Sequence, residues 1–317
     1  MHSLVKESPC TNNTSGAGKT QLLLTLLLAV QLPPPHGLSK SAIYISTEAL
    51  LSTTRLAQLL STHPHLSTLP TNHQPSLSHI LGIQTPDLES QEHILRYQLP
   101  VAIQKHNIGL VILDSVAANF RAEFEKKGQN GGAASMAKRG TQLVQLGALL
   151  RDLARMEGIV VVVANQVADR FTRAPSNNVS RTTSANSQGN ARDTTPQPTQ
   201  DLDLILSPDP LALDHQQKWF TGWGDTQDEP EQSQKTPSLG LVWTNQIACR
   251  IALIKKPVFG NRQPVGDEQW NGEDENHILK WRRWMKVVFA TWAQPSEGKG
   301  VEFEIRGSGI GHVEKKT

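Results

Sequence analysis

The sequence predicts an α/β fold in which a mostly parallel central sheet is flanked by helices and is extended by antiparallel strands after residue 239. Two observations support this prediction. Short apolar stretches alternate with helical patterns over the first half of the 317-residue chain, as in sheets built from β-α-β units. Near the beginning, a glycine-containing loop leads directly into an apolar helix, the arrangement of a phosphate-binding loop.

The loop carries the residue types that a bound triphosphate requires. It consists of Ser15, Gly16, Ala17, Gly18, Lys19, Thr20 and Gln21, and the apolar helix follows over 22–30. Small residues let backbone N–H groups close around the phosphates, while the lysine can bind the β- and γ-phosphates and the threonine hydroxyl can bind Mg²⁺. The helix adds its positive N-terminal end. Asn13 stands where the G-x-x-x-x-G-K-[ST] pattern has its first glycine, so a chance glycine-rich loop is the alternative interpretation.

Three apolar stretches, over 42–48, 109–115 and 158–166, each carry a polar side chain at or near their ends. The carboxyl ends of parallel strands meet at one edge of a sheet, so we expect these side chains beside the loop. Asp114 would hold Mg²⁺ through water, Glu48 would polarise an attacking water as a general base, and Gln166 would sense the γ-phosphate. The alternative for Asp114 is a helix N-cap that follows a core strand.

The remaining pattern predicts the other elements. Strands are expected near 41–46, 79–84, 108–114 and 159–165, and helices near 51–61, 89–106 and 137–157. Only Leu4 and Val5 offer a strand before the loop, which predicts either a very short strand or an incomplete start of the sequence. Stretches near 250–254, 284–290 and 301–305 are β-branched or alternating, with no long helix between them, which predicts antiparallel strands.

Composition divides the chain into a core over 1–167, a polar insertion over 168–238 and strands that complete the core over 239–317. Residues 172–200 are rich in Ser, Thr, Asn, Gln and Pro, so we expect them to be disordered. The cluster of Trp219, Phe220 and Trp223 predicts either a local anchor, which we favour, or a docking or base-stacking surface. The basic, aromatic stretch 280–286 predicts a strand with a charged face, although nucleic-acid binding is an alternative.

Global properties exclude few functions. The formal net charge of +2 gives no general attraction to nucleic acid. Two cysteines define neither a disulfide framework nor a metal site. No apolar stretch is long enough to cross a membrane, and the first residues do not form a signal peptide.

The order of these motifs resembles the core of the RecA-type recombinases, and the eukaryotic branch more than the bacterial one. The resemblance rests on the phosphate-binding loop and on the stretches 44–48, 55–56, 113–115 and 164–167. Within that branch, 28–38, 91–100 and 239–246 are similar to a fungal recombinase paralogue rather than to the strand-exchange recombinase. The resemblance covers nearly the whole chain apart from the insertion, and it implies a RecA-like P-loop ATPase core.

The resemblance also implies roles for individual residues, with ATP and Mg²⁺ as cofactors. Lys19 and Thr20 would bind phosphate and Mg²⁺, Glu48 would be the catalytic glutamate, and Asp114 would be the Walker B acid. Arg55 would stack on adenine, and Gln166 would be the nucleotide sensor. Arg121 lies where recombinases begin their first DNA-binding loop, and a phosphate contact and an ordinary solvated arginine are equal alternatives for it.

At the level of function, the resemblance implies a nuclear mediator of homologous recombination. It would pair with a second paralogue and stabilise the recombinase filament on single-stranded DNA during repair of double-strand breaks. The alternative is a self-assembling, DNA-dependent ATPase that exchanges strands, and weak DNA-dependent turnover fits the resemblance. The long polar segment between Gln166 and Leu239, and the lack of a match to the family's small N-terminal module, favour the mediator. An unrelated P-loop ATPase is a third alternative.

Overall fold

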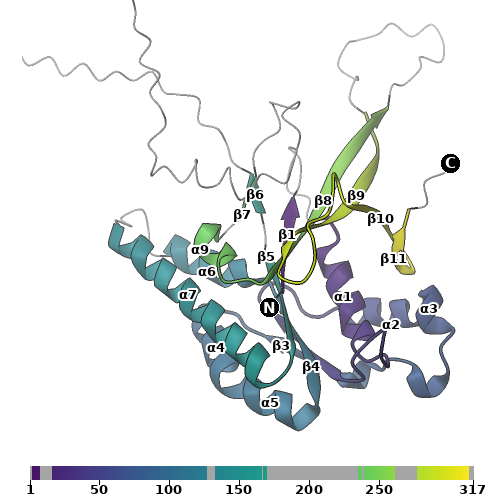
Figure 1. Cartoon of the computed structure of the whole chain (residues 1–317), viewed down its shortest axis with the longest axis horizontal. Coiled ribbons are helices and arrows are strands. Elements are labelled where there is room, and N and C mark those ends of the chain that lie inside the picture. The colour runs from purple at the N-terminus through teal and green to yellow at the C-terminus, as the bar shows by residue number, and fades with distance from the viewer. Residues whose placement is uncertain are drawn as a thin grey trace, which may run out of the picture.

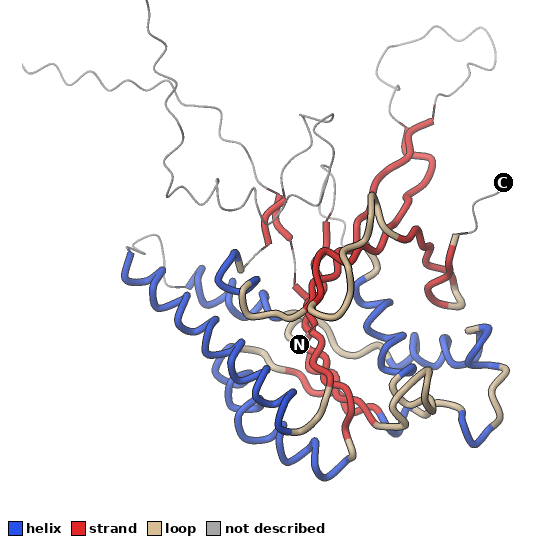
Figure 2. Tube along the Cα trace, in the orientation of Figure 1, coloured by secondary structure: helices blue, strands red, loops and turns tan. Residues whose placement is uncertain are grey.

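A nine-stranded sheet runs through the part of the chain that the structure describes (Figures 1 and 2). The structure is a computed structural model that describes residues 2–7, 16–126, 133–165, 167–169, 235–237, 239–260 and 277–313. The strand order is β11-β10-β9-β8-β1-β5-β4-β2-β3. The strands are β1 His2–Glu7, β2 Ser41–Ser46, β3 Ile80–Gln84, β4 Ile108–Asp114, β5 Val160–Asn165, β8 Cys249–Gly260, β9 His277–Ala290, β10 Val301–Arg306 and β11 Gly309–His312.

The sheet combines a parallel and an antiparallel part. Strands from β8 through β1, β5, β4 and β2 to β3 pair in parallel. Strands β9, β10 and β11 extend the sheet beyond β8 by antiparallel pairing. A separate antiparallel pair joins β6, Val167–Asp169, to β7, Lys235–Pro237. The fold class predicted from the sequence is therefore confirmed.

Helices cover both faces of the parallel strands (Figure 1). One face carries α1 Lys19–Ala29, α2 Thr53–Thr62 and α3 Pro64–Ser67, and the short 3-10 helices η1 Thr71–His73 and η2 Leu77–His79 follow in the chain. The other carries α4 Leu88–His93, the π-helical turn η3 Ile94–Gln98, α5 Leu99–His106, α6 Val116–Lys126, α7 Ala133–Met156 and α9 Gly240–Thr244. None of the described helices is long and apolar enough to cross a membrane.

Alternating side chains of each strand separate the core into two layers, as the period of two in a strand requires. In β4, Val111 and Leu113 pack in the cluster that includes residues of α5 and α7. Leu110 and Ile112 pack in the other cluster, with Leu27 of α1. Continuous apolar runs of this kind are typical of parallel strands covered on both faces.

Most predicted elements agree with the structure, and the differences have physical reasons. The strand candidate at Leu4 and Val5 is β1, which lies between β5 and β8. The helix expected over 89–106 contains a π-helical turn just before Pro100. A proline has no N–H for the regular helical ladder, which disturbs the helix there. The stretch 280–286 lies within β9, as predicted. Residues 172–200 and the Trp219 cluster lie outside the described residues, and the boundaries of the insertion stay a prediction.

Candidate nucleotide-binding site

In the described part of the phosphate-binding loop, the backbone requires glycine at position 18, and Gly16 lies close to the antiparallel strands. Gly18 has φ +102°, a conformation that side chains rarely adopt, and a Cβ there would lie 3.0 Å from Ile305 Cδ1. A Cβ on Gly16 would lie 3.0 Å from the Nζ atom of Lys255. Arg283 Nε donates a hydrogen bond to the Gly16 carbonyl oxygen, at 2.9 Å. Side chains of the strands β8, β9 and β10 therefore pack against the loop. Ser15 lies outside the described residues.

Lys19, at the start of α1, points toward the carboxyl ends of the parallel strands. Its Nζ atom donates to the backbone oxygen of Asn165, which ends β5, at 3.4 Å. Burial lowers the pKa of the Lys19 ammonium, while Asp114 and Glu48 act in the opposite direction. A cation held at this position lacks full hydration, so an anionic ligand would gain a strong, charge-assisted contact from it.

Asp114 ends β4 and accepts hydrogen bonds from neighbours on two other elements. The Tyr44 hydroxyl of β2 donates to Asp114 Oδ2 at 2.8 Å, and the Thr20 hydroxyl of α1 also bonds to this side chain. Burial raises the pKa of Asp114, although both hydrogen bonds and Lys19 oppose that change. Burial and Asp114 together raise the pKa of Tyr44.

Three hydrogen bonds join the end of β2 to the end of β4. Thr47 N donates to the Asp114 carbonyl oxygen at 2.9 Å, and Thr47 Oγ1 donates to the Ser115 carbonyl oxygen at 2.8 Å. Ser115 N donates back to Thr47 Oγ1 at 2.9 Å. Since Thr47 is fixed in this way, the next residue, Glu48, is held at the same edge of the sheet.

Glu48 forms an ion pair with Arg121 of α6, in which Arg121 Nη2 lies 3.4 Å from Glu48 Oε1. Both side chains are about half exposed, and such pairs are weak. The structure thus places Arg121 beside the glutamate predicted to be the general base. Its predicted DNA contact stays a prediction.

Arg55, in the first turn of α2, lies next to the site through a contact with α1. Its Nε atom donates to Gln21 Oε1 at 2.9 Å. Its Nη1 atom donates to Gln58 Oε1 at 2.6 Å and to the Gly307 carbonyl oxygen at 2.8 Å. Its Nη2 atom donates to the Arg306 carbonyl oxygen at 2.8 Å. The helix start is set by Ser52, whose hydroxyl caps the Arg55 N–H.

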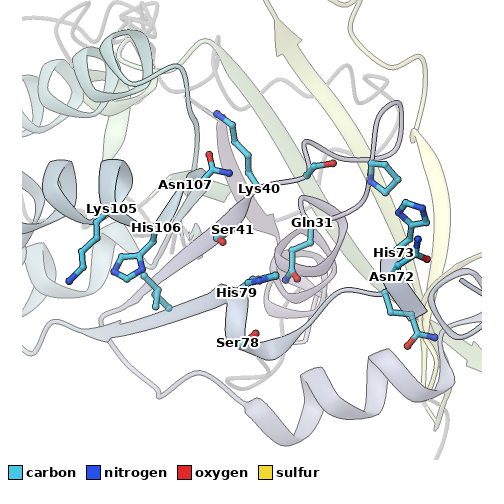
Figure 3. Close-up of a pocket in the computed structure, with 14 residues that line it drawn as sticks. Gln31, Lys40, Ser41, Asn72, His73, Ser78, His79, Lys105, His106 and Asn107 are labelled. Atoms are coloured by element: carbon cyan, nitrogen blue, oxygen red, sulfur yellow. The ribbon is translucent and has the colours of Figure 1, made fainter. Parts of the chain in front are cut away.

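A cavity of about 580 Å³ lies elsewhere, near the starts of β2 and β4 (Figure 3). Its lining includes Gln31, Lys40, His79, His106 and Asn107. Figure 3 shows the Lys40 and Lys105 side chains reaching away from one another. The nucleotide residues predicted from the sequence line the opposite ends of the strands, so the loop geometry, rather than this cavity, defines the candidate site.

The donor set fits a magnesium nucleotide. Mg²⁺ prefers oxygen ligands such as carboxylates and hydroxyls, and Thr20 and Asp114 bring one of each into contact. The small residues of the loop let backbone N–H groups face phosphate oxygens, and Lys19 supplies the positive charge. When bound, the metal would neutralise phosphate charge. Glu48 would lie at the same edge to orient or deprotonate a water.

The motif residues could be predicted from the sequence, whereas several residues that support them could not. The structure brings Lys19, Thr20, Glu48 and Asp114 together, whereas Gln166 lies outside the described residues. Other contributors were not anticipated: the hydroxyl of Tyr44, the Arg283 contact to the loop, the packing of Phe303 and Ile305 at Gly18, and the carbonyl groups at 306 and 307. Only Tyr44 carried a signal, since it places a polar group within an apolar strand.

Comparisons with known proteins agree with this geometry. A family model described as Rad51 matches residues 12–185. The chain is 41% identical over 250 residues to the DNA repair protein rhp57 of Schizosaccharomyces pombe, covering 76% of this chain and 61% of that protein. It is 28% identical over 342 aligned positions to the DNA repair protein RAD57 of Saccharomyces cerevisiae, covering 93% and 72%. It is 38% identical over 160 residues to the DNA repair protein XRCC3 of Bos taurus, covering 49% and 45%.

The fold and the phosphate-binding loop thus define a RecA-like P-loop domain. Because the matched model covers more than half of the sequence, the chain belongs to the Rad51 family. Its similarity to rhp57 and RAD57 confirms the resemblance to a fungal recombinase paralogue. The chain covers less than two thirds of the length of rhp57.

Proposed function

We propose that this protein binds ATP with Mg²⁺ and acts in the nucleus as a mediator of homologous recombination in the repair of double-strand breaks. The observation that carries the proposal is the convergence of Lys19, Thr20, Asp114 and Glu48 at one edge of the sheet in a chain of the Rad51 family. Its relatives rhp57, RAD57 and XRCC3 are named as DNA repair proteins.

Within the site, each residue has a proposed role. Lys19 and the loop amides bind the phosphates, Thr20 binds Mg²⁺ directly and Asp114 binds it through water. Glu48 orients or deprotonates the attacking water, and Arg55 stacks on the adenine ring. Gln166 senses the γ-phosphate. Arg121 either contacts DNA phosphate or serves as the partner of Glu48.

We further propose that nucleotide serves as a switch for assembly. The protein would pair with a second recombinase paralogue, and the pair would stabilise the recombinase filament on single-stranded DNA. The long polar segment after Gln166 favours this role over autonomous strand exchange. Any ATP hydrolysis would then be weak and DNA-dependent.

ATP turnover and binding by the purified chain test this proposal, with and without single-stranded DNA. Tight binding of a fluorescent ATP analogue with little turnover would support the switch. Strong DNA-stimulated turnover by the lone protein would favour a strand-exchange enzyme instead. The Lys19→Ala variant is the control for binding at the loop.

Assembly needs its own measurement. We expect sedimentation of the chain mixed with a second recombinase paralogue to show a heterodimer that is more stable with ATP and Mg²⁺ than without them. Filaments formed by the chain alone on single-stranded DNA would contradict the mediator role.

A further inference from the structure

The turn between β10 and β11 is anchored on α2 at a point next to the candidate nucleotide site. Arg55 Nη2 donates to the Arg306 carbonyl oxygen and Arg55 Nη1 to the Gly307 carbonyl oxygen, both at 2.8 Å. The Thr62 hydroxyl, two turns further along α2, donates to the Gln58 carbonyl oxygen at 2.7 Å and also lies 3.2 Å from the Gly307 oxygen. Residues that are about 250 positions apart in the sequence thus meet at a single guanidinium group.

The partners of Arg55 fix the plane of its guanidinium. Gln21 is bonded to the Nε atom, and Gln58 and the two turn carbonyls are bonded to the terminal nitrogens. All N–H groups of a guanidinium lie in its plane, so hydrogen bonds at its edges leave its faces available for stacking. Gln21 follows Thr20 directly, so this half-buried group lies beside the loop expected to bind phosphate.

Close packing holds the turn against α2. Gly309, the first residue of β11, has φ +112°, and a Cβ there would lie 3.1 Å from Leu59 Cδ2 and 3.2 Å from His63 Cδ2. On the preceding strand, Phe303 and Ile305 pack against Gly18 of the loop. The β10–β11 hairpin therefore contacts both the loop and the arginine.

We propose that the β10–β11 hairpin is a positioning element for base recognition: its turn carbonyls orient Arg55 so that a face of the guanidinium receives the base of the bound nucleotide. This inference rests on the proposed nucleotide binding. It assigns the antiparallel C-terminal strands a part in selecting a nucleoside triphosphate over triphosphate alone. Arg306 and Gly307 act through their backbone oxygens, and Gly309 acts by allowing the turn to approach α2.

Two glycines of β11 provide a matched pair of variants. In Gly309→Ala, the new methyl group would strain the backbone and push the turn away from α2. In Gly311→Ala, the new methyl group would meet no atom within 4 Å, and Gly311 has no positive φ. The two substitutions add the same methyl group to the same strand. Only Gly309→Ala is expected to displace the turn, so Gly311→Ala is its control.

The experiment measures the affinity of the full chain for Mg²⁺-ATP and for Mg²⁺-tripolyphosphate, each by displacement of a fluorescent ATP analogue or by calorimetry. Since a cation stacked on an aromatic ring contributes modestly, we expect Gly309→Ala to lose roughly fivefold to tenfold in ATP affinity. Its affinity for tripolyphosphate should stay within about twofold of the wild type, because phosphate is bound by the loop. Gly311→Ala should match the wild type for both ligands.

A double-mutant cycle shows whether the hairpin acts through Arg55. The loss in Arg55→Ala should resemble that in Gly309→Ala, and the combined variant should lose little more than either alone, since coupled residues are not additive. Additive losses would contradict the assigned route. If Gly309→Ala does not fold, Thr62→Val is the substitute: it removes the longer contact of the hydroxyl with the Gly307 oxygen, together with the bond to the Gln58 carbonyl oxygen, and should produce a smaller loss of the same kind.

The outcomes separate the two proposals. If wild-type protein binds neither ligand, the proposed nucleotide site is wrong. If it binds both and Gly309→Ala binds ATP normally, only the role of the hairpin is wrong. Equal losses for ATP and tripolyphosphate would mean that the hairpin supports the loop rather than the base, which also overturns the inference.

Discussion

Lys19 has a lowered pKa because burial disfavours its charged form, even though Asp114 and Glu48 lie nearby. A lysine kept charged in this environment contributes little to the stability of the unliganded protein, but it provides a strong contact for an anion. For Asp114, burial likewise disfavours the charged form and raises the pKa, although Lys19 and two hydrogen bonds favour the charged carboxylate. Both conflicts between burial and charge fit the proposed ligand, because a nucleotide would bring phosphate to Lys19 and a metal to Asp114.

Replacing Lys19 by alanine should separate binding from folding. We expect Lys19→Ala to lose roughly 10- to 100-fold or more in ATP affinity, as expected for a charge-assisted contact. Its free energy of unfolding without nucleotide should change by about 1 kcal/mol or less, since a partly desolvated charge is removed. Equilibrium titration with a fluorescent ATP analogue and urea denaturation measure the two quantities. Unchanged ATP affinity would refute the site assignment.

Asp114→Asn should make the unliganded protein equally or more stable, by up to about 1 kcal/mol. Burial raises the pKa of Asp114, which means that the ionised carboxylate lowers the free energy of unfolding. The asparagine oxygen can still accept the hydrogen bond from Tyr44. The stabilisation by Mg²⁺-ATP in a thermal unfolding assay should shrink at the same time. A melting temperature several degrees below that of the wild type would contradict this view of the carboxylate.

Individual site residues could be predicted from the sequence where their role follows from a local motif. Lys19, Thr20 and Asp114 could be named because their chemistry depends on residue type and on position at a strand or helix end. The contacts of Arg55 could not, because they are made to backbone carbonyls at 306 and 307. A carbonyl group carries no residue-type signal, and the sequence does not state which distant turn approaches α2.

Among the elements, the junction of α2 and α3 depends on a histidine. His63 Nδ1 accepts a hydrogen bond from His65 N at 3.3 Å and so caps α3. Burial and the neighbouring His65 lower the pKa of His63 below 6.5. A protonated ring would lose this acceptor, so the cap requires the neutral form.

The stability of the protein should therefore fall on acidification below about pH 6.5. Because the folded pKa of His63 is the lower one, the unfolded chain binds more protons between the two values, and the free energy of unfolding rises with pH through that window. One proton sets an upper limit of about 1.4 kcal/mol per pH unit, and solvent screening of this partly exposed ring keeps the slope well below that limit. Urea denaturation at pH 7.5 and 5.5 would measure it.

The control is His63→Asn, which keeps a capping acceptor without titrating in this range. The difference in unfolding free energy between wild type and variant should change with pH, whereas the contributions of histidines that do not interact with His63 cancel. A difference that is the same at both pH values would show that His63 does not contribute.

The predicted strand bounds agree with the structure where burial alone determines the pattern of apolar residues. Strands β2 and β4 have the predicted bounds because both are apolar runs covered on two faces. Strand β8 extends to Gly260, beyond the predicted end at 254, because Lys255, Lys256 and Pro257 pair with the equally polar β9. Helix α6 was not among the helices predicted from the sequence. Long-range strand pairing and side-chain packing determine these elements, and local sequence patterns do not record them.

For the whole molecule, β1 is the connection between the parallel and the antiparallel parts. It pairs with β5 on one side and with β8 on the other. We expect Leu4→Pro to lower the free energy of unfolding by roughly 2–4 kcal/mol, since a proline within an interior strand removes a ladder N–H and leaves a carbonyl without its partner.

Leu4→Val is the matched control, because it keeps the N–H group and favours strands. Urea denaturation followed by circular dichroism would compare the two variants. Equal midpoints for Leu4→Pro and Leu4→Val would show that β1 does not contribute to the stability of the sheet.

The position of β1 also affects how the chain folds during synthesis. In the finished sheet, Val5 lies opposite Asn165 and Ala252. At about 5–20 residues per second, a ribosome needs roughly 10 to 50 seconds to make the residues between β1 and its second neighbour. During that interval β1 has been made while its edge toward β8 has no partner strand, and its edge toward β5 has none until residue 165 is made. β1 is therefore open to incorrect strand pairing during that interval, and a chaperone that shields β1 until β8 is made would reduce this misfolding.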